Sequence, residues 1–158
     1  MTRPDTPSVS CSDFNQLTPH DVHDLLKLRQ DVFVLEQAAL YPDIDGKDPV
    51  ARHLFIRETA SGDLIGAIRL FVAPDQGIAR IGRVVIARSA RGSGLGRILM
   101  QAGIDKAEEL LPGCAIHLGA QAYLEKFYKS LEFTTVSEVY VEDGIPHIDM
   151  VRAGSEAH

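Results

Sequence analysis

The sequence predicts a single mixed α/β domain, with helices on both faces of a mixed sheet. The chain has 158 residues, a length that suits one domain able to bury its own core. Its composition of 45% hydrophobic and 24% charged residues is typical of a globular protein. Strand-like and helix-like runs follow one another in the order β-α-β-β-β-α-β-α-β-β, with turn signals between them.

The first half of the chain predicts a helix followed by three strands. In "LTPHD", Thr18 suits the N-cap, Pro19 the first helical position and Asp21 the capping box. Apolar residues then recur at roughly helical spacing as far as Phe33. The turn-rich stretch 39–49 predicts a loop. Strands are expected at 53–58 and 64–73, which "TASGD" joins as a hairpin, and at 78–87.

The second half predicts two further helices and three strands. A helical apolar face runs from 94 to 110, where "LPG" ends it. A short strand at 114–120 and a short helix at 122–131 follow. The stretches 133–141 and 145–151, joined by the turn "EDG", predict a closing hairpin. We therefore expect a flexible segment at 1–12, one domain at 13–152 and a flexible tail at 153–158.

Composition and charge exclude several classes of function. The net charge of −6 argues against nucleic-acid binding, and no apolar run approaches the ~20 residues that span a membrane. The start of the chain lacks the apolar core of a secretory signal. Cys11 and Cys114 provide neither a disulfide framework nor a metal site, and "DIDG" has its glycine too early for a calcium loop. These features favour a cytoplasmic protein with free thiols and no metal.

The glycine-rich stretch "RGSGLG" lies in a segment, 76–104, that has no acidic residue and five arginines. Gly92 and Gly94 would begin a dinucleotide fingerprint, but Gly96 comes one residue too early for its third glycine. The Gly-Lys-Ser/Thr of a nucleotide triphosphate loop is missing as well. Glycines before a helix let successive backbone amides face one anion, and Arg91 and Arg97 can add charged contacts. The loop therefore predicts a pyrophosphate site.

This loop resembles the signature of the GNAT superfamily of N-acetyltransferases, R-x-x-G-x-G after a strand, with Arg91, Gly94 and Gly96 at its defined positions. "FYKSLEF" at 127–133 is similar to the second motif of that family, except that Glu132 stands where glycine is usual. If this position needs a positive φ, glutamate there costs about 1 kcal/mol relative to glycine. Five further stretches resemble the ElaA-like branch across 14–152: "LRQDVFVLEQ", "YPDIDGKD", "IGRVVI", "LGAQAYLEKFY" and "EDGIPHIDM".

The resemblance implies acetyl-coenzyme A as the donor and a primary amine, on a small molecule or a peptide, as the acceptor. It implies that the strand at 82–86 splays from the one at 116–120, so that a free strand edge binds the pantetheine arm and a backbone N–H polarises the thioester carbonyl. Homodimers are common in the family. The cofactor-binding residues implied are Val84, Val85, Ile86, Arg91, Gly92, Ser93, Gly94, Leu95, Gly96 and Arg97.

The same resemblance implies a general acid. Tyr128 stands where the family often places it, and its hydroxyl would protonate the leaving thiolate. The alternative is that Tyr128 is an amphipathic core residue. Cys11 and Cys114 lie outside the motifs, so we expect direct transfer without a covalent enzyme intermediate.

Several residues are candidates for the base that deprotonates the amine. Glu36 ends an apolar run, where partial burial could raise its pKa, and His147 lies in the closing strand and could titrate near neutrality. Each has a structural alternative, as a helix-end acid or a hydrogen-bonded core histidine, and a water chain could replace both. Asp43, Asp45 and Asp48 either attract a cationic acceptor or belong to a solvated loop. A non-catalytic acyl-CoA sensor is the alternative function.

Overall fold

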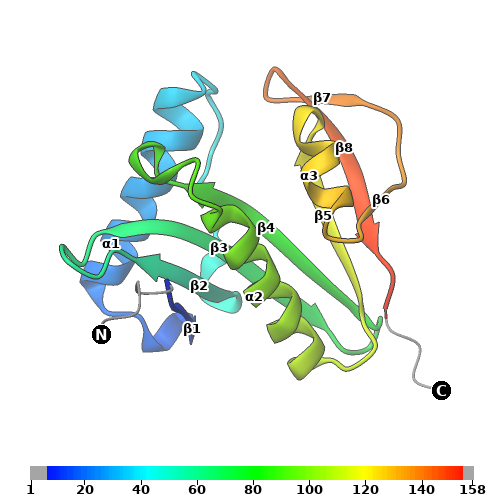
Figure 1. The fold of residues 1–158 in the computed structure, drawn as a ribbon, viewed down its shortest axis with the longest axis horizontal. Coiled ribbons are helices and arrows are strands. Elements are labelled where there is room, and N and C mark those ends of the chain that lie inside the picture. Colours follow the sequence, from blue (N-terminus) through cyan, green and yellow to red (C-terminus); the bar gives the residue numbers. More distant parts are fainter. Residues whose placement is uncertain (1–6, 155–158) are drawn as a thin grey trace.

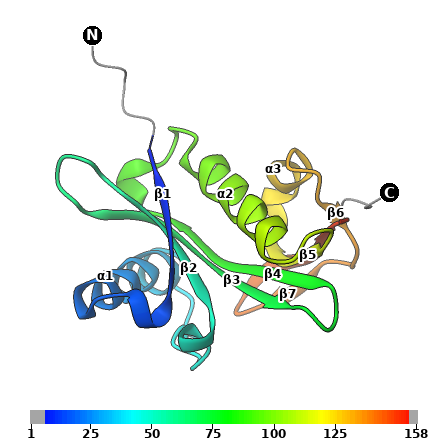
Figure 2. The same cartoon turned by 90° about the horizontal axis from the view of Figure 1, so that it is seen from below.

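The computed structural model describes residues 7–154, which form an eight-stranded mixed sheet with helices on both faces (Figure 1). The strands lie in the order β1-β2-β3-β4-β5-β8-β6, and β7 pairs with β8. Helix α1 covers one face of the sheet, and α2 and α3 cover the other (Figure 2). The helices are α1 Pro19–Arg29, α2 Leu95–Leu110 and α3 Glu125–Lys129. The strands are β1 Val9–Asp13, β2 Arg52–Arg57, β3 Leu64–Ala73, β4 Ile78–Ile86, β5 Ala115–Gln121, β6 Thr134–Thr135, β7 Tyr140–Glu142 and β8 Ile145–Arg152.

The structure confirms the predicted mixed α/β fold, but the strands near the two ends of the chain differ from the prediction. The strand expected at 133–141 is two short strands, β6 and β7, which pair with different parts of β8. Between them the Ser137 hydroxyl accepts a hydrogen bond from the Asp149 amide at 2.8 Å, so a side chain replaces the ladder bond. At the other end β1 pairs with β2 from Val9 onward, so the sheet begins inside the segment expected at 1–12. Residues 1–6 and 155–158 lie outside the described residues.

Helix α1 begins as its sequence predicts. The Thr18 hydroxyl accepts a hydrogen bond from the Asp21 amide at 3.0 Å, and the Asp21 carboxylate accepts one from the Thr18 amide at 2.9 Å. The apolar run after Arg29 does not continue as an α-helix. Gln30–Glu36 form a π-helical segment, in which each turn is wider. This segment carries Phe33 and Glu36 to the wall of the cleft described below.

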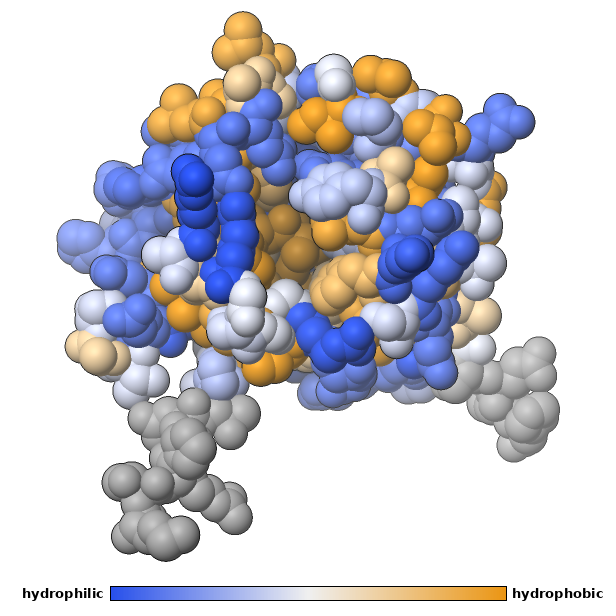
Figure 3. Space-filling model, turned by 45° about the horizontal axis from the view of Figure 1, so that its top comes forward, coloured by the Kyte–Doolittle hydropathy of each residue, from blue (hydrophilic) through white to orange (hydrophobic). Residues whose placement is uncertain are grey.

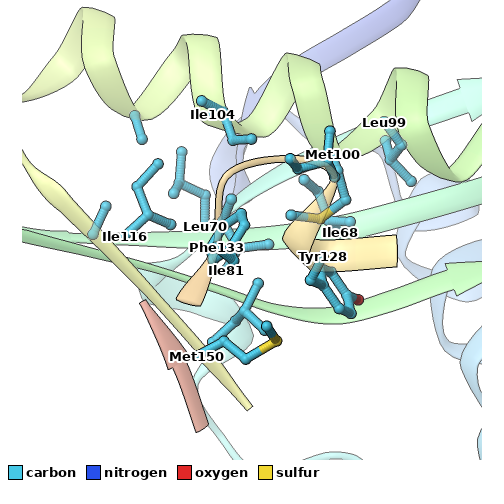
Figure 4. Packing of buried hydrophobic residues seen from close by; sticks show 14 of the residues in the cluster. Ile68, Leu70, Ile81, Leu99, Met100, Ile104, Ile116, Tyr128, Phe133 and Met150 are labelled. Carbon is cyan, nitrogen blue, oxygen red and sulfur yellow. The ribbon is translucent and has the colours of Figure 1, made fainter. Parts of the chain in front are cut away.

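Two hydrophobic clusters fix the helices on the sheet. The larger lies between the sheet and the pair α2 and α3, where Leu99, Met100 and Ile116 are fully buried (Figure 4). The smaller lies under α1 around Leu25 and Phe55. Because α2 is held along its buried face, the loop at its N-terminus stands at a fixed place beside the end of β4.

Strands β4 and β5 are joined at one end and diverge at the other (Figure 1). They pair in parallel only between 78–80 and 115–117. Strand β4 is also irregular: its pairing with β3 shifts between Ala67 and Arg69, and Arg83 has a φ of 49°. The expected splay is thus present, and the edge of β4 beyond Arg80 has no β5 partner in the described chain.

Candidate active site

A cleft of about 750 Å³ opens where β4 and β5 diverge. Its walls come from β4, β5, the π-helical segment, the loop before α2, α3 and the β7–β8 hairpin. Figure 3 shows a hollow with an apolar floor between hydrophilic rims. The cleft brings together Glu36, Tyr128 and His147, the candidate catalytic residues predicted from sequence. It is also lined by most of the predicted cofactor residues, namely Val84, Val85, Ile86, Arg91, Gly92, Gly94, Leu95 and Gly96.

The loop before α2 has the geometry of an anion site. Gly92 and Gly94 have φ values of 85° and 79°, in the left-handed region that favours glycine. Gly94 is the N-cap of α2, and the first amides of an α-helix have no partner within the helix. A Cβ at either glycine would meet nothing within 4 Å, so a ligand can approach the backbone there. Open amides at a helix N-terminus fit the pyrophosphate of coenzyme A.

Ser93 and Arg97 do not line the cleft. The Ser93 hydroxyl donates to the Ala90 carbonyl at 2.7 Å and so closes the loop on itself. The Arg97 guanidinium donates to the Ser130 hydroxyl and lies 5.9 Å from the centre of the Phe127 ring. Arg97 thereby joins the start of α2 to α3 in this structure. Their predicted roles toward the cofactor stay predictions.

Arg91 and Glu36 form an ion pair across the cleft wall. The Arg91 guanidinium donates to both Glu36 carboxylate oxygens, one of them at 3.0 Å, and to the Ile86 carbonyl at 3.2 Å. The hydrogen bond from Arg91 lowers the pKa of Glu36. The expectation that burial raises the pKa of Glu36 is therefore wrong. A carboxylate held in this way is a weak base.

Tyr128 lies on α3 with its ring in the larger core cluster and its oxygen at the edge of that cluster (Figure 4). The ring makes edge contacts with Phe127 and Phe133, at centroid distances of 5.0 and 6.0 Å. Burial raises the pKa of Tyr128 to about 12. The hydroxyl therefore stays protonated at neutral pH and can donate a hydrogen bond into the cleft.

The end of α3 fixes the position of Tyr128. The Phe133 amide donates to the Tyr128 carbonyl at 3.1 Å, and the Glu132 amide donates to the Lys129 carbonyl at 3.0 Å. These two bonds are a Schellman motif, whose C′ residue takes a left-handed conformation. Glu132 occupies that position with a φ of 71°. The structure thus shows that the position where the family usually has glycine does require positive φ.

His147 lies on β8 and has one nitrogen fixed by the backbone. Its Nδ1 is 2.7 Å from the Ile145 carbonyl oxygen, which can only accept, so Nδ1 carries a hydrogen. The neutral ring then has its lone pair on Nε2. That nitrogen is 3.8 Å from a Glu142 carboxylate oxygen, and the ring stacks on Tyr140. His147 can therefore accept a proton at Nε2, the nitrogen nearer the Glu142 carboxylate.

The three acids of the 39–50 loop are neither left to solvent nor free to attract a substrate. Asp43 and Asp48 are buried against Arg29, which is fully buried and lies 2.9 Å from each carboxylate. Arg69 pairs with Asp45 at 2.6 Å and with Asp48 at 3.1 Å. Both expectations for this loop are wrong, because three arginines from α1, β3 and β4, namely Arg29, Arg69 and Arg83, pair with its three acids. Sequence patterns could not pair residues so far apart.

These ion pairs lower the pKa values of two acids of the loop, Asp45 and Asp48. Hydrogen bonding to Arg69 holds the pKa of Asp45 well below its usual range. Burial alone would raise the pKa of Asp48, but the hydrogen bonds and charges of Arg29 and Arg69 outweigh burial and lower it. The loop is therefore held in one place beside the cleft, where Tyr41 and Pro42 form part of the wall.

The cleft also contains residues that the sequence did not single out. They come from the π-helical segment and the residue after it, the 39–50 loop, β5, the turn Ala122–Leu124 and α3, and include Phe33, Gln37, Tyr41, Gln121, Tyr123 and Phe127. All six lie within the stretches that resemble the family, but the resemblance did not mark these positions as parts of the site. Within residues 7–154 no group of three or more His, Cys, Asp or Glu side chains is placed to hold a metal ion. None of the helices described is long and apolar enough to cross a membrane.

Comparison with known proteins identifies relatives over nearly the whole chain. Residues 29–153 match the family model described as an acetyltransferase (GNAT) domain. The protein ElaA of Escherichia coli K12 is 38% identical over 139 residues, which cover 87% of this chain and 91% of that protein. The crystal structure of an acyl-CoA N-acyltransferase from Pseudomonas aeruginosa has a TM-score of 0.86 at 40% identity, covering 94% of this chain and 100% of the other. The crystal structure of Escherichia coli ElaA also has a TM-score of 0.86, at 35% identity and with coverage of 93% and 99%.

Proposed function

Because the chain belongs to the GNAT acetyltransferase family, we propose that it transfers an acetyl group from acetyl-coenzyme A directly to a primary amine. Membership of the family makes the chain an acyl-CoA-dependent N-acyltransferase; the acetyl donor, the amine class and the roles of individual residues belong to the proposal. The observation that carries it is that one cleft joins the glycine loop, a protonated tyrosine and a histidine with a free ring lone pair at the open edge of β4.

The donor side of the proposal rests on loop 91–97 and β4. The left-handed glycines and the N-terminus of α2 would hold the pyrophosphate. The backbone of Val84, Val85 and Ile86, whose edge is not paired with β5, would hold the amide-bearing arm. Bound acetyl-coenzyme A supplies an activated thioester. A backbone N–H of the same edge, aimed at the carbonyl oxygen, would stabilise the negative charge that develops there.

The acceptor side rests on His147. An amine is protonated at neutral pH and must lose a proton before it can attack a carbonyl. The Nε2 atom of His147 has the free lone pair for this, because Nδ1 is engaged by the Ile145 carbonyl. Glu36 is the weaker candidate, because its carboxylate is held by Arg91 and its pKa is lowered.

Tyr128 serves as the hydrogen-bond donor to the departing sulfur. A thiolate leaves more easily when a positioned O–H stabilises it. The pKa of about 12 keeps the Tyr128 proton in place over the working pH range. Its ring is fixed by Phe127 and Phe133, so the hydroxyl needs no reorganisation during the reaction.

Thiol release from acetyl-coenzyme A, measured with a panel of primary amines, tests the proposal, and mass spectrometry identifies the N-acetyl product. We expect transfer to at least one amine and a loss of about a hundredfold or more in kcat for Tyr128→Phe. An unchanged unfolding midpoint for this variant shows that the loss is not one of folding. Full activity of Tyr128→Phe across the pH range contradicts the role of the tyrosine. Tight binding of coenzyme A without transfer to any amine supports the sensor instead.

A further inference from the structure

A second pocket, of about 370 Å³, adjoins the deep end of the cleft. Ile81 and Gly82 of β4 and Leu118 and Gly119 of β5 line both cavities. These residues follow directly after the last paired positions of the two strands, Arg80 and His117. The two cavities therefore meet at the point where β4 and β5 separate.

The second pocket is lined by basic residues. Its remaining walls are Lys47, Arg69, Phe71, Arg80 and His117, and no acidic residue of the described chain lines it. Phe71, Arg80 and His117 are opposite one another on neighbouring strands, so their side chains form one row across the same face of the sheet. Asp149, on the next strand, accepts a hydrogen bond from Tyr140 and is not part of the wall.

The positive charges in this pocket are not equally available. Arg69 is buried, and its charge is matched by Asp45 and Asp48. Lys47 and Arg80 are exposed, and neither side chain forms an ion pair with any residue in 7–154. Two cations without partners in a concave site favour an anionic ligand.

The charges at the other side of the cleft have the opposite sign. Glu142 and Asp143, at the turn of the β7–β8 hairpin, line the cleft beside His147. An acceptor that extends from His147 to the second pocket would meet acids at its amine and bases at its far end. A simple amine or polyamine would match only the first of these.

We infer that the acceptor carries a carboxylate, which binds in the second pocket between Lys47 and Arg80 while its amine lies at His147. This inference rests on the proposed function and narrows the acceptor from any primary amine to an amino acid or another amine with an anionic group. Phe71, which Arg69 covers at 5.2 Å, gives the pocket an apolar wall for the carbon chain between the two charged ends.

A binding experiment tests the pocket without turnover. The full chain, labelled with nitrogen-15 and saturated with coenzyme A so that loop 91–97 is occupied, is titrated with succinate. We expect the amide signals of Gly82 and Gly119 to shift, and the succinate Kd to rise about tenfold or more in Lys47→Ala/Arg80→Ala. Lys126→Ala removes an exposed cation of α3 that lines neither cavity, and serves as the matched control.

A turnover experiment compares amines that differ only in the carboxylate and carry it at the far end of a carbon chain, such as 6-aminohexanoate with pentylamine and lysine, through its side-chain amine, with cadaverine. We expect kcat/KM to favour the carboxylate-bearing member about tenfold or more, and this preference to disappear in Lys47→Ala/Arg80→Ala but not in Lys126→Ala. Equal use of both members, with no shift at Gly82 or Gly119, overturns the inference and leaves the acetyltransferase proposal intact. Succinate binding that depends on Lys47 and Arg80, without transfer to any amine, supports the pocket and contradicts the proposed function.

Discussion

At the scale of single residues, Glu132 has a strained backbone conformation close to Tyr128, the candidate general acid. Its φ of 71° strains a side chain that bears a Cβ, and its ion pair with Arg152 is exposed. We expect Glu132→Gly to raise the free energy of unfolding by about 0.5–1 kcal/mol, because relief of strain exceeds the entropy that glycine adds to the unfolded chain. Urea denaturation measures this change in the free energy of unfolding. Glu132→Gln keeps the strain and removes the charge, and should be nearly neutral; an equal gain in both variants would assign the effect to charge.

Substitutions at His147 and Glu36 distinguish the two candidates for the base that deprotonates the amine. We expect His147→Gln to lower kcat by about a hundredfold, because glutamine cannot take the proton from the amine. Glu36→Gln should leave kcat near the wild-type value and change mainly the KM for acetyl-coenzyme A, because it frees Arg91 at the cofactor loop. Steady-state kinetics with both substrates varied separate these effects. A greater loss of kcat in Glu36→Gln would make Glu36 the base.

At the scale of elements, the N-terminus of α2 depends on the conformation of Gly94. We expect Gly94→Ala to lower the free energy of unfolding by about 1 kcal/mol and to weaken coenzyme A binding about tenfold or more, because an alanine disfavours the φ of 79° that aims the amides. Gly62, on the β2–β3 turn, has a φ of 76° and equally open surroundings. Gly62→Ala should cost similar stability without loss of affinity in calorimetry. Equal affinity losses would show that global destabilisation, and not the loop, is responsible.

The elements that the sequence predicted well are those with local signals. Strands β2, β3 and β4 were bounded by turn residues, so their limits were nearly right, and the capping residues Thr18 and Asp21 placed the start of α1 correctly. The sequence could not show that the run after Arg29 widens into a π-helical segment, because its apolar spacing fits both kinds of helix. It also could not show that the Ser137 side chain interrupts the strand between β6 and β7.

In the candidate site, too, the parts with local sequence signals were predicted and those that depend on distant residues were not. The glycine loop and Tyr128 belong to contiguous motifs, and the structure places both at one cleft. The ion pair of Glu36 with Arg91 joins residues 55 positions apart, and no periodicity indicates such a partner. The expectation for the Glu36 pKa was wrong for this reason: burial was read from neighbours in sequence, while the decisive charge came from elsewhere in the fold.

At the scale of the whole molecule, the network of Asp43, Asp45 and Asp48 with its arginines joins α1, β3, β4 and the 39–50 loop. Asp45 and Asp48 have a usual pKa of 3.8, and the folded state lowers both. A carboxyl group whose pKa is lowered by folding stabilises the fold above its unfolded pKa. That contribution is lost as pH falls toward the folded pKa, and a tenfold difference in proton affinity between the folded and unfolded chain corresponds to about 1.4 kcal/mol.

We therefore expect the free energy of unfolding to change little between neutral pH and about pH 5, and to fall steeply below about pH 4. Protonation of Asp45 and Asp48 would leave the buried Arg69 without an ionised partner and would take from Arg29 one of its two carboxylate partners, which adds to the loss. Urea denaturation at a series of pH values measures this dependence. Asp45→Asn removes one lowered pKa, so this variant should be less stable at pH 7 and lose less stability between pH 5 and pH 3. A pH dependence identical to that of the wild type would mean that the acid-sensitive carboxylates lie outside this network.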